Sequence, residues 1–123
     1  MKNAQRTVRE FIVERPTMME NNFNPERMAA LLQQEVDELK AEIGKEDVTK
    51  IAQELPDVFW FIISIAEIYG IDLENAFYAK AIRNEEKYPK ELFNNGLTYE
   101  EAATLCRAMW NRDNDLNYTP DKI

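Results

Sequence analysis

The chain has 123 residues, a formal net charge of −8 at pH 7, one cysteine and no histidine. Its length suits a single domain, and one cysteine can form neither an internal disulfide nor an all-cysteine zinc site. The lack of histidine excludes Ser-His and Cys-His nucleophile pairs and histidine metal sites, and the acidic balance argues against nucleic acid as a partner, because phosphate backbones bind basic surfaces.

The apolar segments are too short to cross a membrane. The longest run, Val58 to Ala66, is interrupted by Ser64, whereas a membrane-spanning helix needs about 20 apolar residues. The N-terminus lacks the basic-then-apolar pattern of a secretory signal. We therefore expect a soluble, cytoplasmic protein with no membrane partner.

Helical patterns follow one another along the chain, and no alternating strand pattern occurs in the sequence. We predict helices over residues 3–14, 24–43, 47–69, 72–88 and 98–111, with a loop over 18–23. Gly44, Gly70 and Gly96 each follow a helix, where left-handed cap residues belong. The predicted fold class is all-α, a bundle of four to five helices in one domain over residues 1–112, followed by an irregular polar tail over residues 113–123.

Local signals place several helix boundaries. Asn24 precedes a proline, and this pair is a favoured helix start. Thr98 and Glu101 have the spacing of a capping box. Pro56 lies inside a predicted helix, where it removes the hydrogen bond to the Ala52 carbonyl, and we expect it to kink that helix.

Two pairs of acidic residues, each three residues apart, lie on consecutive predicted helices. Glu35 and Glu38 flank the apolar stripe of the first of these helices, which by itself is ordinary for a solvated edge. Glu54 and Asp57 share a face with Phe61 in a helix that is apolar on nearly every side. Because a buried carboxylate without a partner costs several kcal/mol, a cation is expected to offset this second pair.

Antiparallel packing of the two helices would bring the acid pairs together. Four carboxylates in one place repel one another unless a cation lies among them, and oxygen ligands select hard ions such as Mg²⁺ or Mn²⁺. An alternative also remains open from the sequence, in which arginine or lysine side chains neutralise each acid separately.

Three segments carry a family resemblance. They are residues 34–38 (QEVDE), residues 54–57 (ELPD) and residues 84–89 (NEEKYP). Their order and spacing resemble the Glu-Glu-x-x-Glu, Glu-x-x-Asp and Asn-x-x-Lys/Arg-Tyr-Pro motifs of the MazG-like nucleotide pyrophosphohydrolases, in the all-α NTP pyrophosphatase superfamily. The likeness covers residues 24–89, about half of the chain.

The resemblance implies a magnesium-dependent enzyme that hydrolyses a nucleoside or deoxynucleoside triphosphate to the monophosphate and pyrophosphate. It implies that Mg²⁺, with Mn²⁺ as a substitute, is held by four carboxylates: Glu35, Glu38, Glu54 and Asp57. The implied catalytic residues are Glu35, Glu38 and Gln34.

Gln34 departs from the family pattern, which has glutamate at that position. A glutamine accepts a hydrogen bond from water but cannot take its proton. Three alternatives remain open from the sequence: a metal-bound hydroxide that needs no base, a base supplied by Glu38 or Glu42, or low activity.

The resemblance also implies that Lys80, Asn84 and Lys87 face the substrate. Their spacing places them on one helical face, although a lysine-rich face is equally typical of plain surface. Trp60 follows the second acidic motif closely, and we select it as the candidate ring for the nucleotide base. The alternative is that Trp60 belongs to the core.

The helix over residues 47–69 is apolar on nearly every side and needs more cover than four short helices provide. The resembled family pairs its subunits, so we expect a homodimer or homotetramer with active sites near the subunit contacts. Two other functions remain open. One is a dUTPase or phosphoribosyl-ATP pyrophosphatase of the same superfamily, and the other is a non-catalytic helical adaptor.

Overall fold

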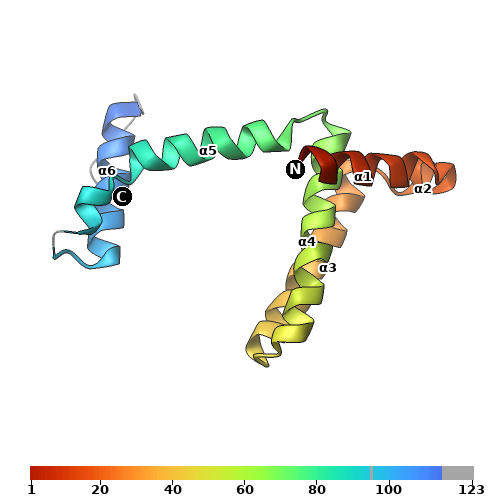
Figure 1. Ribbon diagram of the computed structural model, residues 1–123, viewed down its shortest axis with the longest axis horizontal. Helices are drawn as coiled ribbons and strands as arrows, with labels where there is room; N and C mark the ends of the chain where they lie inside the picture. Colours follow the sequence, from red (N-terminus) through yellow and green to blue (C-terminus); the bar gives the residue numbers. More distant parts are fainter. Residues whose placement is uncertain (95, 115–123) are drawn as a thin grey trace. The chain divides into compact units, whose positions relative to one another are not determined.

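The computed structural model describes residues 1–94 and 96–114 (Figure 1). These residues form six α-helices and one 3-10 helix and contain no strand, which confirms the all-α prediction with more helices than the four to five expected. The elements are α1 (Lys2–Val13), α2 (Pro16–Asn21), α3 (Pro25–Gly44), α4 (Val48–Ile68), α5 (Leu73–Lys87), η1 (Lys90–Phe93) and α6 (Tyr99–Asn114). Among the described helices, none combines the length and apolar character needed to span a membrane.

The predicted helix starts are present. The Asn24 side chain accepts a hydrogen bond from the Arg27 amide at 2.9 Å. In the capping box before α6, the Thr98 hydroxyl accepts from the Glu101 amide and the Glu101 carboxylate accepts from the Thr98 amide, both at 3.1 Å. Helix α4 continues through Pro56 as one helix, and its predicted kink stays a prediction.

Other local predictions were wrong. Part of the predicted loop is helical, because Pro16 occupies the first turn of α2, a position that proline favours. Gly44 is the last residue of α3, and the left-handed residue of the following turn is Glu46, with φ of 55°. Helix α6 includes residues 113 and 114, which were predicted to be irregular, and the rest of that predicted tail, 115–123, lies outside the described residues.

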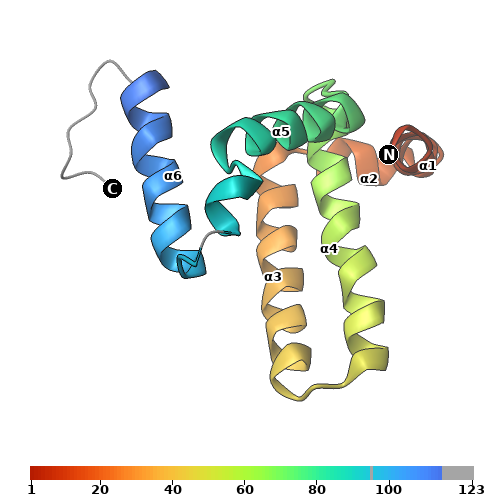
Figure 2. The same ribbon diagram turned by 60° about the vertical axis from the view of Figure 1, so that its left-hand side comes forward.

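The chain divides into two compact units, Met1–Ala76 and Phe77–Ile123. The single domain predicted over residues 1–112 stays a prediction. In the first unit, α3 and α4 run antiparallel and lie side by side (Figure 2). Helix α1 packs on α4 through a core of Val8, Ile12 and Ile63. The α3–α4 pair carries both acidic motifs, so its packing determines where the carboxylates meet.

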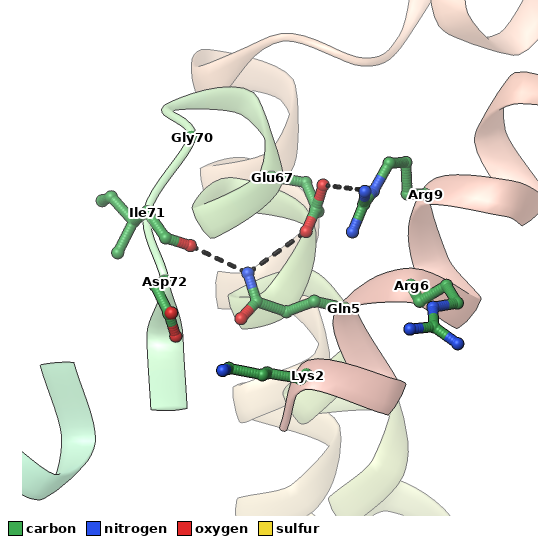
Figure 3. Close-up of a pocket in the computed structure, with 8 residues that line it drawn as sticks. All are labelled: Lys2, Gln5, Arg6, Arg9, Glu67, Gly70, Ile71 and Asp72. Carbon is green, nitrogen blue, oxygen red and sulfur yellow. Dashed lines mark hydrogen bonds and ion pairs between the residues drawn. The ribbon is translucent and has the colours of Figure 1, made fainter. Parts of the chain in front are cut away.

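Gln5 of α1 forms hydrogen bonds at the C-terminal end of α4 in the first unit (Figure 3). Its side chain is only 6% exposed. Its amide nitrogen donates to the Glu67 carboxylate at 3.1 Å and to the Ile71 carbonyl at 2.8 Å, and its oxygen accepts from the Leu73 amide at 3.0 Å. This one side chain therefore joins α1 to the turn that ends α4 and begins α5.

The second unit contains most of α5 together with η1 and α6. Helix α6 buries Ala102, Ala103 and Cys106, and it contacts η1. Phe93 of η1 lies between two tyrosine rings, with centroids 6.4 Å from Tyr88 and 6.1 Å from Tyr99. These contacts hold α6 to the segment that follows α5.

Candidate functional site

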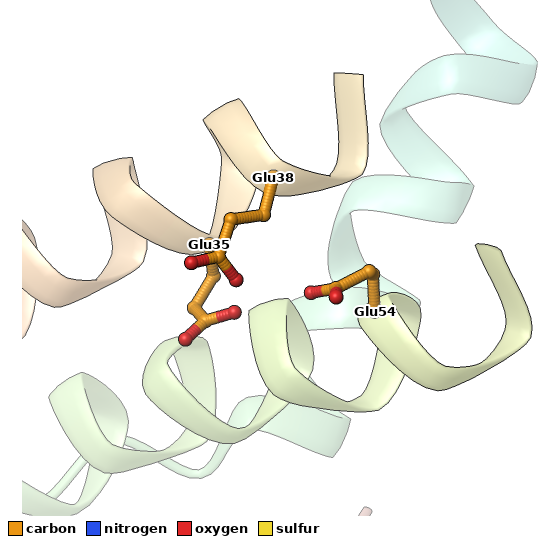
Figure 4. A group of neighbouring side chains, drawn as sticks. All are labelled: Glu35, Glu38 and Glu54. Carbon is orange, nitrogen blue, oxygen red and sulfur yellow. The ribbon is translucent and has the colours of Figure 1, made fainter. Parts of the chain in front are cut away.

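Three glutamates from two helices converge in the first unit (Figure 4). Glu35 and Glu38 project from α3 and Glu54 projects from α4, and each offers a carboxylate oxygen within 4.8 Å of the others. The three-residue spacing places both α3 glutamates on one side of that helix, and the antiparallel return of α4 brings Glu54 opposite them. The structure therefore brings together three of the four carboxylates predicted as metal ligands.

Asp57 is the fourth predicted ligand. It is exposed, and none of its oxygens lies within 4.8 Å of all three glutamates. Its negative charge nevertheless helps to raise the pKa of both Glu35 and Glu54, so it lies in the same electrostatic neighbourhood. Its role as a ligand stays a prediction.

The three glutamates have no cationic partner among the residues that the structure describes. Within residues 1–94 and 96–114, none of them lies within 4.0 Å of a lysine or arginine nitrogen. Glu35 Oε2 and Glu54 Oε2 are shielded from solvent and have no hydrogen-bond partner. The described lysine and arginine side chains therefore do not neutralise these three acids separately, as the alternative interpretation required.

The crowding of these carboxylates changes their acidity. Burial of the carboxyl group, followed by the nearby Glu38 carboxyl group, raises the pKa of Glu35 from 4.5 to about 7. Burial, then the charges of Glu38 and Asp57, also raises the pKa of Glu54 above its ordinary value. A divalent cation would relieve both effects, because it replaces lost hydration and offsets the mutual repulsion.

The cluster fits a hard divalent cation by its chemistry. Its donors are all carboxylate oxygens, which suit Mg²⁺ or Mn²⁺, and two of these oxygens are buried without a partner. The cluster is only partly buried, because Glu38 is exposed and Glu35 and Glu54 are half-buried. Gln34 is exposed on α3 beside Glu35, and its catalytic role stays a prediction.

Trp60 lines an apolar pocket of about 280 Å³ rather than an open surface. Its ring packs edge to face against Phe11 of α1, with centroids 5.1 Å apart. Leu31 of α3 and Phe61 of α4 also line this pocket. Leu31 precedes Glu35 by one helical turn and Phe61 follows Asp57 by one turn, so the pocket adjoins the acidic cluster. The sequence did not identify the contributions of α1 and α2, because they depend on tertiary packing.

The second unit gathers the predicted substrate-facing residues. Lys80, Asn84 and Lys87 line one small pocket of about 90 Å³ on α5. Arg83 and Trp110 line the same pocket, and Trp110 comes from α6. The shared face predicted from the spacing is present, whereas the contribution of Trp110 gave no signal in the sequence.

The fold and the carboxylate cluster define an all-α protein with a candidate divalent-cation site. The family model for the MazG nucleotide pyrophosphohydrolase domain matches residues 23–91, more than half of the chain, and the chain belongs to this family. No curated protein and no solved structure gave a significant match. Membership confirms the resemblance seen in the sequence and indicates a nucleotide pyrophosphohydrolase of a family that is generally dependent on divalent metals.

Proposed function

We propose that this protein is a magnesium-dependent nucleoside triphosphate pyrophosphohydrolase that releases a nucleoside monophosphate and pyrophosphate. One observation carries the proposal: three glutamates converge within the family-matched range, without a basic partner among the described residues, and two of their oxygens are buried and unpartnered. An adaptor protein has no use for such a cluster, since unpaired buried carboxylates destabilise the fold.

Glu35, Glu38 and Glu54 would hold the ion, and Asp57 is the nearest further carboxylate available to it. A divalent ion bound there neutralises charge on the phosphate oxygens and lowers the pKa of a bound water. The cluster itself contributes by keeping its oxygens free of other partners. Because a ligand must be deprotonated, the raised pKa of Glu35 implies that ion binding near neutral pH releases a proton.

The proton of the attacking water needs an acceptor other than Gln34, whose amide can only orient the water. Glu42 is poorly placed for this task, because one of its oxygens lies 3.7 Å from Lys45 Nζ and the other is buried without a partner. Glu38 is the exposed member of the cluster. This difference favours Glu38 over Glu42 as the base.

Two sets of residues are proposed to recognise the substrate. The apolar pocket beside Trp60 adjoins the acidic cluster and suits a nucleotide base, whose flat faces pack against aromatic rings. Lys80 and Lys87 would bind phosphate oxygens as point charges, with Asn84 as a hydrogen-bond donor. Their support is the shared pocket on α5.

We also propose that two copies of the chain pair through α4. Val48, Ala52, Leu55, Phe59 and Ile62 recur at alternating spacings of four and three, which is the pattern of a helix–helix seam. Among the described residues this stripe is poorly covered, with Leu55 52% exposed, Phe59 39% and Ile62 37%. A homodimer would cover the stripe. A homotetramer would also have to bury this stripe in one of its interfaces.

Light scattering measures the oligomer directly. We expect twice the chain mass for the unmodified protein and the single-chain mass for Phe59→Glu, because a charge in an apolar seam is costly to bury. Thr49→Glu adds the same charge at an exposed position of α4 outside the stripe and should leave the dimer intact. A monomeric unmodified protein would refute the pairing.

Hydrolysis is tested with a panel of nucleoside triphosphates, dUTP and phosphoribosyl-ATP, with and without Mg²⁺. We expect one pyrophosphate for each monophosphate formed, only when the ion is present, with several triphosphates accepted. Turnover of dUTP alone or of phosphoribosyl-ATP alone would assign one of the narrower activities. Absence of turnover, together with no rise in melting temperature at millimolar Mg²⁺, would support the adaptor instead.

A further inference from the structure

The small pocket in the second unit is unusual in its charge. Its lining consists of three cations, one amide and one indole, with no acidic side chain: Lys80, Arg83, Asn84, Lys87 and Trp110. The whole chain carries 23 acidic and 15 basic residues. Three cations around one hollow therefore run against the composition and mark a local site for negative charge.

The cations of this pocket form no ion pair with the part of the chain that the structure describes. Across residues 1–94 and 96–114, Lys80, Arg83 and Lys87 have no carboxylate within 4.0 Å. Lys87 Nζ lies 5.4 Å from the centroid of the Tyr88 ring, a contact that limits the positions of this side chain without neutralising its charge. The positive charge is therefore available to a ligand.

Trp110 turns an exposed helix face into a concave pocket. Helix α5 alone would present its cations on a convex surface, and the indole from α6 supplies the opposite wall. Trp110 is half-buried, and it also borders a second hollow together with Cys106 and Met109. The family match ends at residue 91, which leaves α6 and its tryptophan outside the matched domain.

We propose that Arg83 and Trp110, with Lys80, Asn84 and Lys87, form a pocket for a phosphoryl group of the substrate. This inference rests on the proposed function and adds two residues to it. Arginine binds phosphate oxygens through its planar fork, and the indole N–H is a donor only, so both suit an anion.

The size of the pocket identifies the part of the substrate that it takes. Pockets that enclose a whole small molecule measure roughly 300 Å³ or more. This pocket, at about 90 Å³, is well below that size, which favours a phosphoryl group over a nucleotide base as its ligand. The base is left to a different pocket, and the residues of α6 act on the anionic end of the substrate.

Binding is measured through Trp110 itself. The chain has two tryptophans, so Trp60→Phe leaves Trp110 as the only indole that fluoresces. In this variant we expect a saturable change in emission when inorganic pyrophosphate is added without metal. Adding Arg83→Gln should weaken this binding about tenfold or more, because a charge-assisted hydrogen bond is lost.

Arg107→Gln is the matched control, because it removes the same charge from an exposed position of the second unit that lies outside the pocket. We expect its affinity for pyrophosphate to change by less than about twofold, as is usual for a general surface charge. No saturable change in emission, or equal weakening by both arginine substitutions, would overturn the proposed pocket.

Steady-state kinetics separate this inference from the proposed function. Trp110→Leu and Arg83→Gln should raise KM about tenfold with kcat little changed, whereas Trp110→Phe should recover part of the loss because it keeps the wall but not the donor. Normal KM values in both variants of a working enzyme would refute the pocket and leave the proposed function standing. Pyrophosphate binding that depends on Arg83, in a protein without turnover, would support the pocket and count against the proposed function.

Discussion

Glu35→Gln should make the ion-free protein more stable at neutral pH, although it removes a proposed metal ligand. The pKa of Glu35 rises from 4.5 to about 7 on folding, so the folded state binds more protons than the unfolded state between these values. The stability that this proton contributes is complete below about pH 4.5 and is lost as the pH rises through 7. Glutamine has no proton to lose and keeps its contribution throughout.

The size of the effect follows from the same pKa. At 1.36 kcal/mol per pH unit, the rise from 4.5 to about 7 has a ceiling of about 3 kcal/mol. Glu35 is only half-buried, so solvent screening reduces this to about 1 kcal/mol. For a chain of this length, that corresponds to a melting temperature about 4 °C higher for Glu35→Gln than for the unmodified protein at pH 7.5, in the presence of a chelator.

The assay is thermal unfolding from pH 4.5 to pH 8, with and without Mg²⁺. The difference between the two proteins should grow with pH and reverse when millimolar Mg²⁺ is added, because only the unmodified site binds the ion well. Glu10→Gln removes an exposed carboxylate of α1 outside the cluster and serves as the control. A difference that is independent of pH would refute the argument that Glu35 is crowded by neighbouring carboxylates.

Glu54→Gln should abolish turnover while leaving the fold intact or more stable, because it removes one charge from the repelling cluster; unaltered pyrophosphate release would remove Glu54 from the site. Gln5→Leu should lower the free energy of unfolding by about 2–4 kcal/mol, because the hydrogen bonds of the buried Gln5 amide to the Ile71 carbonyl and the Leu73 amide are lost. Thr7→Ala, at an exposed position of the same helix, should change it by less than about 0.5 kcal/mol in the same denaturant titration.

Signals within a few residues of one another were sufficient for much of the fold. Asn24 and the Thr98–Glu101 box fixed helix starts because a cap depends on its own next three residues. The start of α2 was missed because residues 18–23 were predicted as a loop, although Pro16 occupies the first turn of a helix. The position of the left-handed residue after α3 was also wrong, since the turn geometry rather than the presence of glycine placed it at Glu46.

In the candidate site, too, the features that depend on nearby residues could be predicted, and those that depend on the packing of distant segments could not. Glu35, Glu38 and Glu54 could be predicted to meet because two short motifs lie on consecutive helices joined by a short turn. The position of Asp57 at the edge of the cluster could not, since it depends on the rotation of α4 against α3. Trp110 joins the α5 cations only through the packing of α6, and no spacing in the sequence records that contact.

The most direct measurement of the central claim is a crystal structure with Mn²⁺ and a non-hydrolysable triphosphate, in which anomalous scattering locates the ion. We predict an anomalous peak among Glu35, Glu38 and Glu54, with the triphosphate in contact with the ion. In the contrary result, these side chains stay free of the ion, and manganese binds elsewhere or not at all. That result would contradict the claim that a divalent cation offsets the repulsion between the carboxylates of α3 and α4.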